Sequence, residues 1–95
     1  MKIKFTREAQ FDFRESVKFY EIRQKGLGEK FSEAVKNTLY FIGENPLGSE
    51  VKYLEVRVTT VKKFPFTIHY SIENGVIIIF AVFHNSRSPR QKDIT

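Results

Sequence analysis

The chain contains no cysteine and no tryptophan, and its 95 residues include only three prolines and five glycines. The absence of cysteine excludes disulfide bridges and cysteine-based metal sites, and it agrees with a reducing compartment. The chain lacks both a run of about 18 apolar residues and the apolar stretch of a signal peptide. We therefore expect a cytoplasmic protein that does not bind a membrane.

The residues that are present are those of one folded domain. A chain of 95 residues is too short for two cores, and its ten phenylalanines and four tyrosines supply the bulky side chains that a small core needs. We therefore assign residues 1–95 to a single domain, in which residues 85–95 form a polar C-terminal tail.

The net charge is +5, from 16 Lys and Arg against 11 Asp and Glu. A basic surface attracts anionic partners such as nucleic acid or an acidic protein segment. A charge of this size is also ordinary for a soluble small domain, so both readings stay open.

Two helices are predicted in the first half of the chain. Residues 2–5 alternate like a short strand, and Thr6 is a suitable N-cap for a helix from Arg7 to about Gln24. Glycines at 26 and 28 separate it from a second helix that ends near residue 43. The expected inward positions of the first helix are Ala9, Phe13, Val17 and Tyr20, and those of the second are Phe31, Ala34, Val35, Thr38, Phe41 and Ile42.

The second half changes to a period of two, which is typical of strands. Three strands are predicted: residues 54–59, with Arg57 on the polar parity; residues 66–72, with His69 on the polar parity; and Val76 to Phe83, apolar at both parities and so covered on both faces. Asn74-Gly75 predicts a tight hairpin turn. Together these elements predict a two-layer α+β domain, in which an N-terminal strand and an α-hairpin pack on one face of an antiparallel β-sheet.

This element order, with three local motifs, resembles the RelE/ParE superfamily of toxins. The motifs are the loop from Glu44 to Gly48; Arg57 followed by the strand from Phe64 to Tyr70; and the ending from Val82 to Pro89, which is similar to the ParE-like branch. The resemblance covers about residues 2–90. It implies a toxin that is neutralised by a cognate antitoxin. It also implies one of two targets: DNA gyrase for ParE-like members, or messenger RNA on the ribosome for RelE-like members, which are endoribonucleases.

The nuclease branch requires a base, an acid and cations around the scissile phosphate. By resemblance, His84, Arg57 and Arg87 are the candidate catalytic residues. However, Thr67 stands where many nuclease members have a second arginine, and Asn85 stands where an aromatic residue often follows the histidine. We therefore favour the non-catalytic, ParE-like function and keep the endoribonuclease as the alternative.

The candidate residues for binding the antitoxin or the target are Arg57, Lys62, Lys63, His69, Arg87 and Arg90. Each also has a purely structural interpretation. Arg57 can pair with Glu55 or Glu73, and the arginines of the tail can simply keep a chain end soluble. His69 is most simply a solvated side chain, and His84 a hydrogen-bonding partner that fixes the tail. The sequence indicates neither a cofactor nor a metal site, because no carboxylate has ligand spacing to the histidines.

Two further alternatives concern apolar residues. Phe11, Phe19 and Ile22 lie off the inward positions of the first helix, and they are either additional core or an interface with the antitoxin or a second toxin. A third function, a basic nucleic-acid-binding module, requires aromatic residues on the uncovered sheet face, where the predicted parity offers Thr67, His69 and Ser71.

Overall fold

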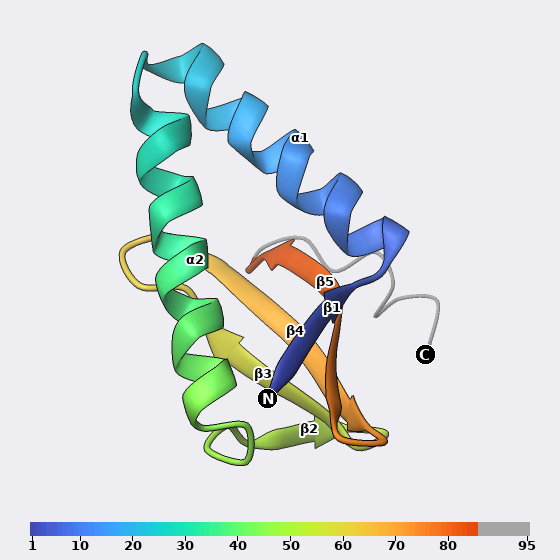
Figure 1. The fold of residues 1–95 in the computed structure, drawn as a ribbon. Helices are drawn as coiled ribbons and strands as arrows, with labels where there is room; N and C mark the ends of the chain where they lie inside the picture. The colour runs from blue at the N-terminus through green and yellow to red at the C-terminus, as the bar shows by residue number, and fades with distance from the viewer. Residues whose placement is uncertain (86–95) are drawn as a thin grey trace.

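The computed structural model describes residues 1–85, which form two layers, a helical hairpin packed on one face of a five-stranded sheet (Figure 1). In chain order the elements are β1 (Lys2–Phe5), α1 (Arg7–Arg23), α2 (Leu27–Glu44), β2 (Val51–Tyr53), β3 (Val56–Thr60), β4 (Phe66–Glu73) and β5 (Val76–His84). The predicted two-layer α+β architecture is confirmed. Within residues 1–85, neither helix is long and apolar enough to cross a membrane.

The sheet has the order β1-β5-β4-β3-β2, and it is mixed rather than wholly antiparallel. The four strands from β2 to β5 form an antiparallel meander, whereas β1 pairs in parallel with β5. Parallel neighbours require a long crossover, and here both helices and three strands separate β1 from β5 along the chain. The first strand therefore closes one edge of the sheet, beside the start of α1.

The first helix begins where the sequence predicted, because Thr6 caps it. The backbone N–H of Ala9 donates to the Thr6 hydroxyl at 3.1 Å, which satisfies one of the free donors of the first turn. The helix ends at Arg23, and Gly26 takes a left-handed conformation with φ +88° in the turn that follows.

The second helix has no side-chain cap of its own, and a carboxylate from α1 takes that role. Glu21 accepts hydrogen bonds from the backbone N–H groups of Gly26 and Gly28, at distances of 3.0–3.1 Å. A negative charge at a helix N-terminus also interacts favourably with the helix dipole. Close approach of the helices is possible because residue 28 is glycine: a Cβ there would lie 2.8 Å from the carbonyl oxygen of Val17.

The core lies between the helices and the sheet. Its centre is Phe31, whose ring contacts Tyr20 of α1, Phe64 of the β3–β4 loop and Phe66 of β4, with ring centroids 4.8–5.2 Å apart. Burial in this cluster raises the pKa of the Tyr20 hydroxyl, and the nearby Arg23 opposes the shift. Other members of the core are Ala9, Val35, Ile42, Val61, Ile68, Tyr70, Ile77, Ile79 and Val82.

The prediction of one continuous strand over residues 54–59 is wrong. Leu54 and Glu55 have φ values of 43° and 63° and form a two-residue turn between β2 and β3, so Leu54 is 78% exposed. Positive φ at both positions is the signature of a type I′ turn, which usually contains Asn or Gly. Because Leu54, Val56 and Val58 alternate with polar residues, the sequence predicted a continuous strand here. The turn, and the strand β2 that precedes it, were therefore not predicted.

The turn predicted for the last hairpin and the interior position predicted for its second strand are confirmed. Asn74 and Gly75 both have positive φ, as a type I′ turn requires, and β5 lies inside the sheet between β1 and β4. A bulge explains why β5 is apolar at both parities: Tyr70 pairs with Ile79 but His69 pairs with Ala81, so Phe80 is an extra residue.

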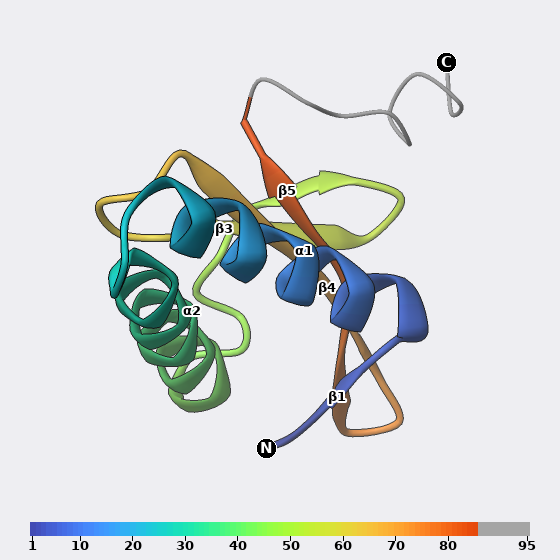
Figure 2. The ribbon, with the colours of Figure 1, turned by 90° about the horizontal axis from the view of Figure 1, so that it is seen from above.

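Five large apolar or aromatic residues of the helices lie outside the core, and one of them is Tyr40 of α2, which is 72% exposed. Phe41, which was predicted to face inward, is 47% exposed, so that prediction is wrong. Phe11, Phe19 and Ile22 of α1 are 58%, 46% and 85% exposed, which rules out the interpretation of these residues as additional core. Figure 2, which looks down on the molecule from above, shows α1 lying across the top of the sheet with no described segment above it.

Candidate functional site

The candidate site is the open face of the sheet, which is the face turned away from the helices. Tyr53 of β2, Thr67 and His69 of β4, and Phe83 of β5 meet there, and we call these four residues the open-face cluster. Thr67 pairs with Phe83 across β4 and β5, which places their side chains on one face. The opposite parity of β4 carries Phe66, Ile68 and Tyr70 into the core.

His69 lies at the centre of the open-face cluster and is bonded through both ring nitrogens. Its Nδ1 is 2.9 Å from the Tyr53 hydroxyl, and its Nε2 is 3.0 Å from the Thr67 hydroxyl. The Phe83 ring meets the imidazole edge-on, with centroids 5.2 Å apart. His69 is half-buried, so the expectation of a simply solvated side chain is wrong. Its ring is held in one orientation by neighbours from three strands.

The sequence pattern missed two members of this cluster. Tyr53 belongs to the strand that was not predicted, and Phe83 was counted only as part of an apolar run. The open face therefore carries more aromatic surface than its predicted parity suggested. Phe83 itself is buried, with 8% of its surface exposed. It therefore contributes packing against His69 rather than exposed surface.

His84 lies on the other face of the sheet. It pairs with Phe66 across β4 and β5, and its imidazole meets the Phe66 ring edge-on with centroids 5.2 Å apart. The two histidines are therefore on opposite faces and cannot bind one ion or one substrate group. Among residues 1–85, no group of three or more His, Cys, Asp or Glu is arranged to hold a metal ion.

Arg57 is also on the helix side of the sheet, so its predicted place on the uncovered face is wrong. It pairs with the buried Tyr70 across β3 and β4. Its guanidinium donates to the carbonyl oxygens of Leu47 at 3.3 Å and Ser49 at 2.6 Å, in the loop between α2 and β2. This parity follows from the register of β3 on β4, in which Arg57 and Thr59 are opposite the core residues Tyr70 and Ile68.

Other contacts join the same loop to the same face of the sheet. The hydroxyl of Tyr70 donates to the carbonyl of Pro46 at 2.8 Å, and the hydroxyls of Ser49 and Thr59 are in contact. Arg57 thus holds the α2–β2 loop against the sheet, in place of the ion pair with Glu55 or Glu73 that the sequence left open.

Replacing Arg57 with alanine is expected to lower the free energy of unfolding by about 1–2 kcal/mol, because two hydrogen bonds from a charged donor are lost. Arg57→Lys should recover only part of this loss, since an ammonium group cannot reproduce the planar fork. Urea denaturation measures the effect. Lys52→Ala is the matched control, because Lys52 is exposed and paired only with Glu50. Equal stability of the Arg57 and Lys52 variants would contradict a loop-holding role.

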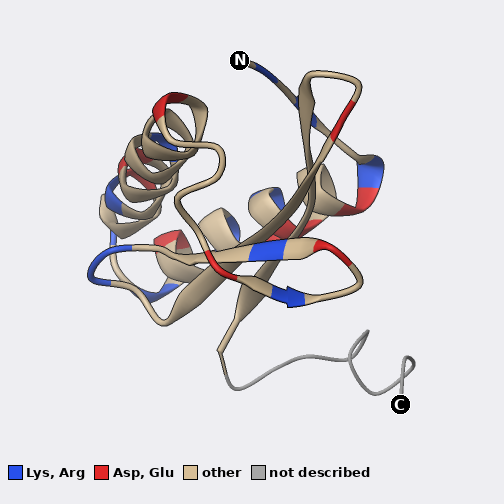
Figure 3. Ribbon diagram, turned by 90° about the horizontal axis from the view of Figure 1, so that it is seen from below, with Lys and Arg blue, Asp and Glu red and all other residues tan. Residues whose placement is uncertain are grey.

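The remaining predicted residues do not join Arg57. His84 and Arg57 are aligned with residues of β4 four positions apart, which is roughly 13 Å along the strand. Lys62 and Lys63 are exposed in the loop after β3, at the opposite end of that strand from Arg57. In Figure 3, where Lys and Arg are blue, the bend between β3 and β4 is basic and lies beside the helices. Arg87 and Arg90 lie outside the described residues.

The charge distribution of the site follows from the strands that build it. Neither β4 nor β5 contains a lysine or arginine, and Glu73 is the only acidic residue in the two strands. The two central strands therefore contribute no cation to the open face, whereas Lys2 and Lys4 of the edge strand β1 lie on it, because Ile3 and Phe5 of the same strand face the core. The open-face cluster itself consists of hydroxyl, imidazole and aromatic groups, and the cations of residues 1–85 near it lie on loops and on the edge strands β1 and β2.

Comparisons with known proteins agree with this fold. The family model described as "ParE toxin of type II toxin-antitoxin system, parDE" matches residues 3–89. A solved structure titled as the chromosomal ParDE TA system from P. aeruginosa aligns with a TM-score of 0.70 at 21% identity, covering 88% of this chain and 95% of that one. The isolated E. coli RelE toxin aligns with a TM-score of 0.66 at 15% identity, covering 98% and 93%. None of the curated protein sequences matches the chain significantly.

At these identities the two structures establish the fold, whereas the family model spans nearly the whole chain. The resemblance predicted from the motifs is thereby confirmed. The chain belongs to the ParE toxin family of type II toxin–antitoxin systems, within the RelE/ParE superfamily.

Proposed function

We propose that this toxin acts in the cytoplasm by binding a cellular target, DNA gyrase, without cutting nucleic acid, and that a cognate antitoxin neutralises it. Membership of the family supports the antitoxin partner. The absence of Lys and Arg from β4 and β5, the two strands that form the middle of the open face, carries the choice of target.

When a ribose 2′-hydroxyl attacks the adjacent phosphate and the RNA chain is cut, negative charge builds up on a crowded phosphate. Enzymes stabilise that charge with cations or other donors placed in advance. Among the described residues, the candidate cations are dispersed. Arg57 is bonded to loop carbonyls, while Lys62 and Lys63 lie on a loop at the end of β3. The candidate catalytic histidine, His84, faces the helix side. These placements favour a binding surface over a ribonuclease site.

We assign the contact with the target to the open-face cluster, flanked by Lys62 and Lys63. An imidazole with two hydroxyls and an aromatic ring can contact a protein surface through hydrogen bonds and apolar area together, as interface hot spots do. The two lysines would steer an acidic partner toward this face.

Induced expression in bacteria, with and without the neighbouring antitoxin gene, tests the proposal. We expect growth arrest with a DNA-damage response while protein synthesis continues at first. In vitro, the purified toxin should inhibit DNA supercoiling by gyrase and leave messenger RNA intact on programmed ribosomes. His84→Ala should retain the growth arrest, whereas His69→Ala should weaken it at least about tenfold in the inducer dose required.

The endoribonuclease is the alternative outcome of the same experiment. A-site cleavage of the message by the purified protein, abolished by His84→Ala in a variant that still folds, would overturn the proposal. Loss of growth arrest in the His84 variant without any cleavage would contradict the assignment to the open face.

A further inference from the structure

The outer surface of α1 carries a stripe of four residues in which two charged side chains lie between two apolar ones. Phe11, Glu15, Lys18 and Ile22 follow the spacing i, i+4, i+7, i+11, which places them on one line along a helix. All four are on the side away from the core: Phe11 is 58% exposed and Ile22 is 85% exposed, and the side chains of Glu15 and Lys18 are 52% and 71% exposed.

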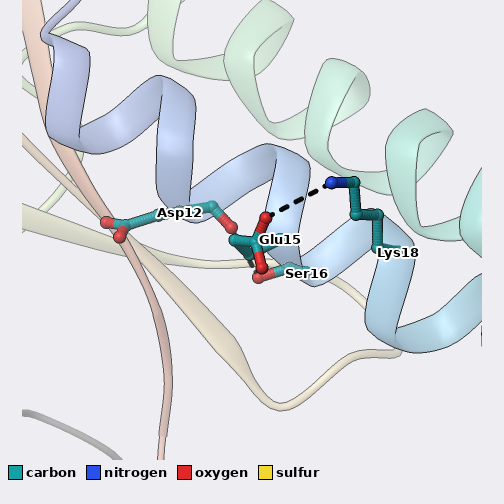
Figure 4. Close-up of polar contacts among 4 residues, drawn as sticks. All are labelled: Asp12, Glu15, Ser16 and Lys18. Atoms are coloured by element: carbon teal, nitrogen blue, oxygen red, sulfur yellow. Dashed lines mark hydrogen bonds and ion pairs between the residues drawn. The ribbon is translucent and has the colours of Figure 1, made fainter.

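The centre of this stripe carries an ion pair. The Glu15 carboxylate lies 3.6 Å from the Lys18 ammonium (Figure 4). Asp12 of the same helix turns away from the stripe, because its carboxylate accepts the backbone N–H of Val82 in β5 at 3.2 Å. The stripe therefore presents one charge of each sign between two large apolar side chains.

The order of these residues complements itself. If a second α1 packs antiparallel about a two-fold axis that passes between residues 16 and 17, Phe11 faces Ile22 of the second copy, and Glu15 faces Lys18 of the second copy. Both contacts then occur twice, as a two-fold interface requires. The apolar residues meet at the two ends, roughly 16 Å apart along the helix, and opposite charges meet at the centre.

A second feature of the surface lies at one end of the stripe. An open hollow of about 350 Å³ is lined by Arg7, Glu8, Phe11 and Asp12, in the first turns of α1. In the antiparallel arrangement, Ile22 of the second copy arrives beside Phe11, where this hollow can receive its side chain. The Ile22 side chain is the most exposed large apolar group of the described helices.

We propose that the outer face of α1 binds a second copy of this chain, forming a two-fold symmetric toxin homodimer. The dimer does not depend on the proposed target. Because α1 covers the opposite side of the sheet from the open-face cluster, both copies keep that cluster accessible. A single helix pair buries less than a standard interface, so we expect a dissociation constant of about 10–100 µM.

Charge reversals test this arrangement by analytical ultracentrifugation of the full chain at up to about 1 mM. Glu15→Lys alone gives two Lys–Lys contacts in the dimer, and Lys18→Glu alone gives two Glu–Glu contacts. Each is expected to weaken dimerisation about tenfold. When the two variants are mixed, each charge meets its opposite across the interface, so a heterodimer of wild-type affinity should form.

The mixing result cannot come from changes within one helix, since each variant keeps its own altered charges. Glu33→Lys and Lys36→Glu, an exposed pair with the same spacing on α2, are the matched controls and should leave the dimerisation unchanged. Ile22→Asp should abolish the dimer. A wild-type chain that stays monomeric at all concentrations, or a mixture that associates no better than the separate variants, would overturn the proposal.

Discussion

Replacing Phe31 with alanine is expected to lower the free energy of unfolding by about 3–5 kcal/mol, the largest effect of any single change considered for this protein. Phe31 is fully buried, and its ring contacts Phe13, Tyr20, Phe64 and Phe66. These contacts join both helices, the β3–β4 loop and β4. Truncation therefore leaves a cavity where these four segments meet.

A domain of this size is stable by about 5–15 kcal/mol in total, so this variant should unfold at a much lower urea concentration. Phe41→Ala is the matched control on the same helix, because Phe41 is 47% exposed. We expect the control to lose less than about 1 kcal/mol. Similar losses in the two variants, measured by circular dichroism during urea denaturation, would mean that Phe31 is not the centre of the core.

The second large effect is expected for Gly28→Ala, which should cost about 1–3 kcal/mol. The added Cβ would lie 2.8 Å from the Val17 carbonyl oxygen and 2.9 Å from the Glu21 carboxylate. Since the carbonyl is backbone, the two helices would have to move apart. The carboxylate that holds the start of α2 would be displaced as well.

Gly43→Ala provides the control within α2. A Cβ at that position meets only Ile3 Cδ1, at 3.6 Å, which is an ordinary van der Waals contact. Alanine is a better helix former than glycine, so this variant should be stabilised by up to about 1 kcal/mol. Thermal unfolding of both variants measures the contrast. A neutral Gly28 variant would show that the close approach of α1 and α2 is not needed for stability.

The sequence predicted the fold of the toxin better than it predicted the surroundings of the candidate site residues. His69 was named as a binding candidate, yet the pattern predicted a solvated side chain, because alternation describes which face a residue occupies and not what else is there. Tyr53 approaches it only after the turn at Leu54 and Glu55 has folded β2 back onto β3. That turn contains neither Asn nor Gly, the residues by which a type I′ turn is usually predicted from sequence.

The sequence by itself determined the order of the elements apart from β2, the N-cap at Thr6, the hairpin at Asn74 and Gly75 and the toxin family, because these depend on local propensity and on short motifs. Only the tertiary structure decided that Arg57 binds a loop, that His69 and His84 lie on opposite faces, and that β1 pairs in parallel with β5. These features depend on strand register, and a shift of one residue moves every side chain of a strand to the other face. Register is fixed by turns and by contacts between distant segments, so local patterns could not supply it.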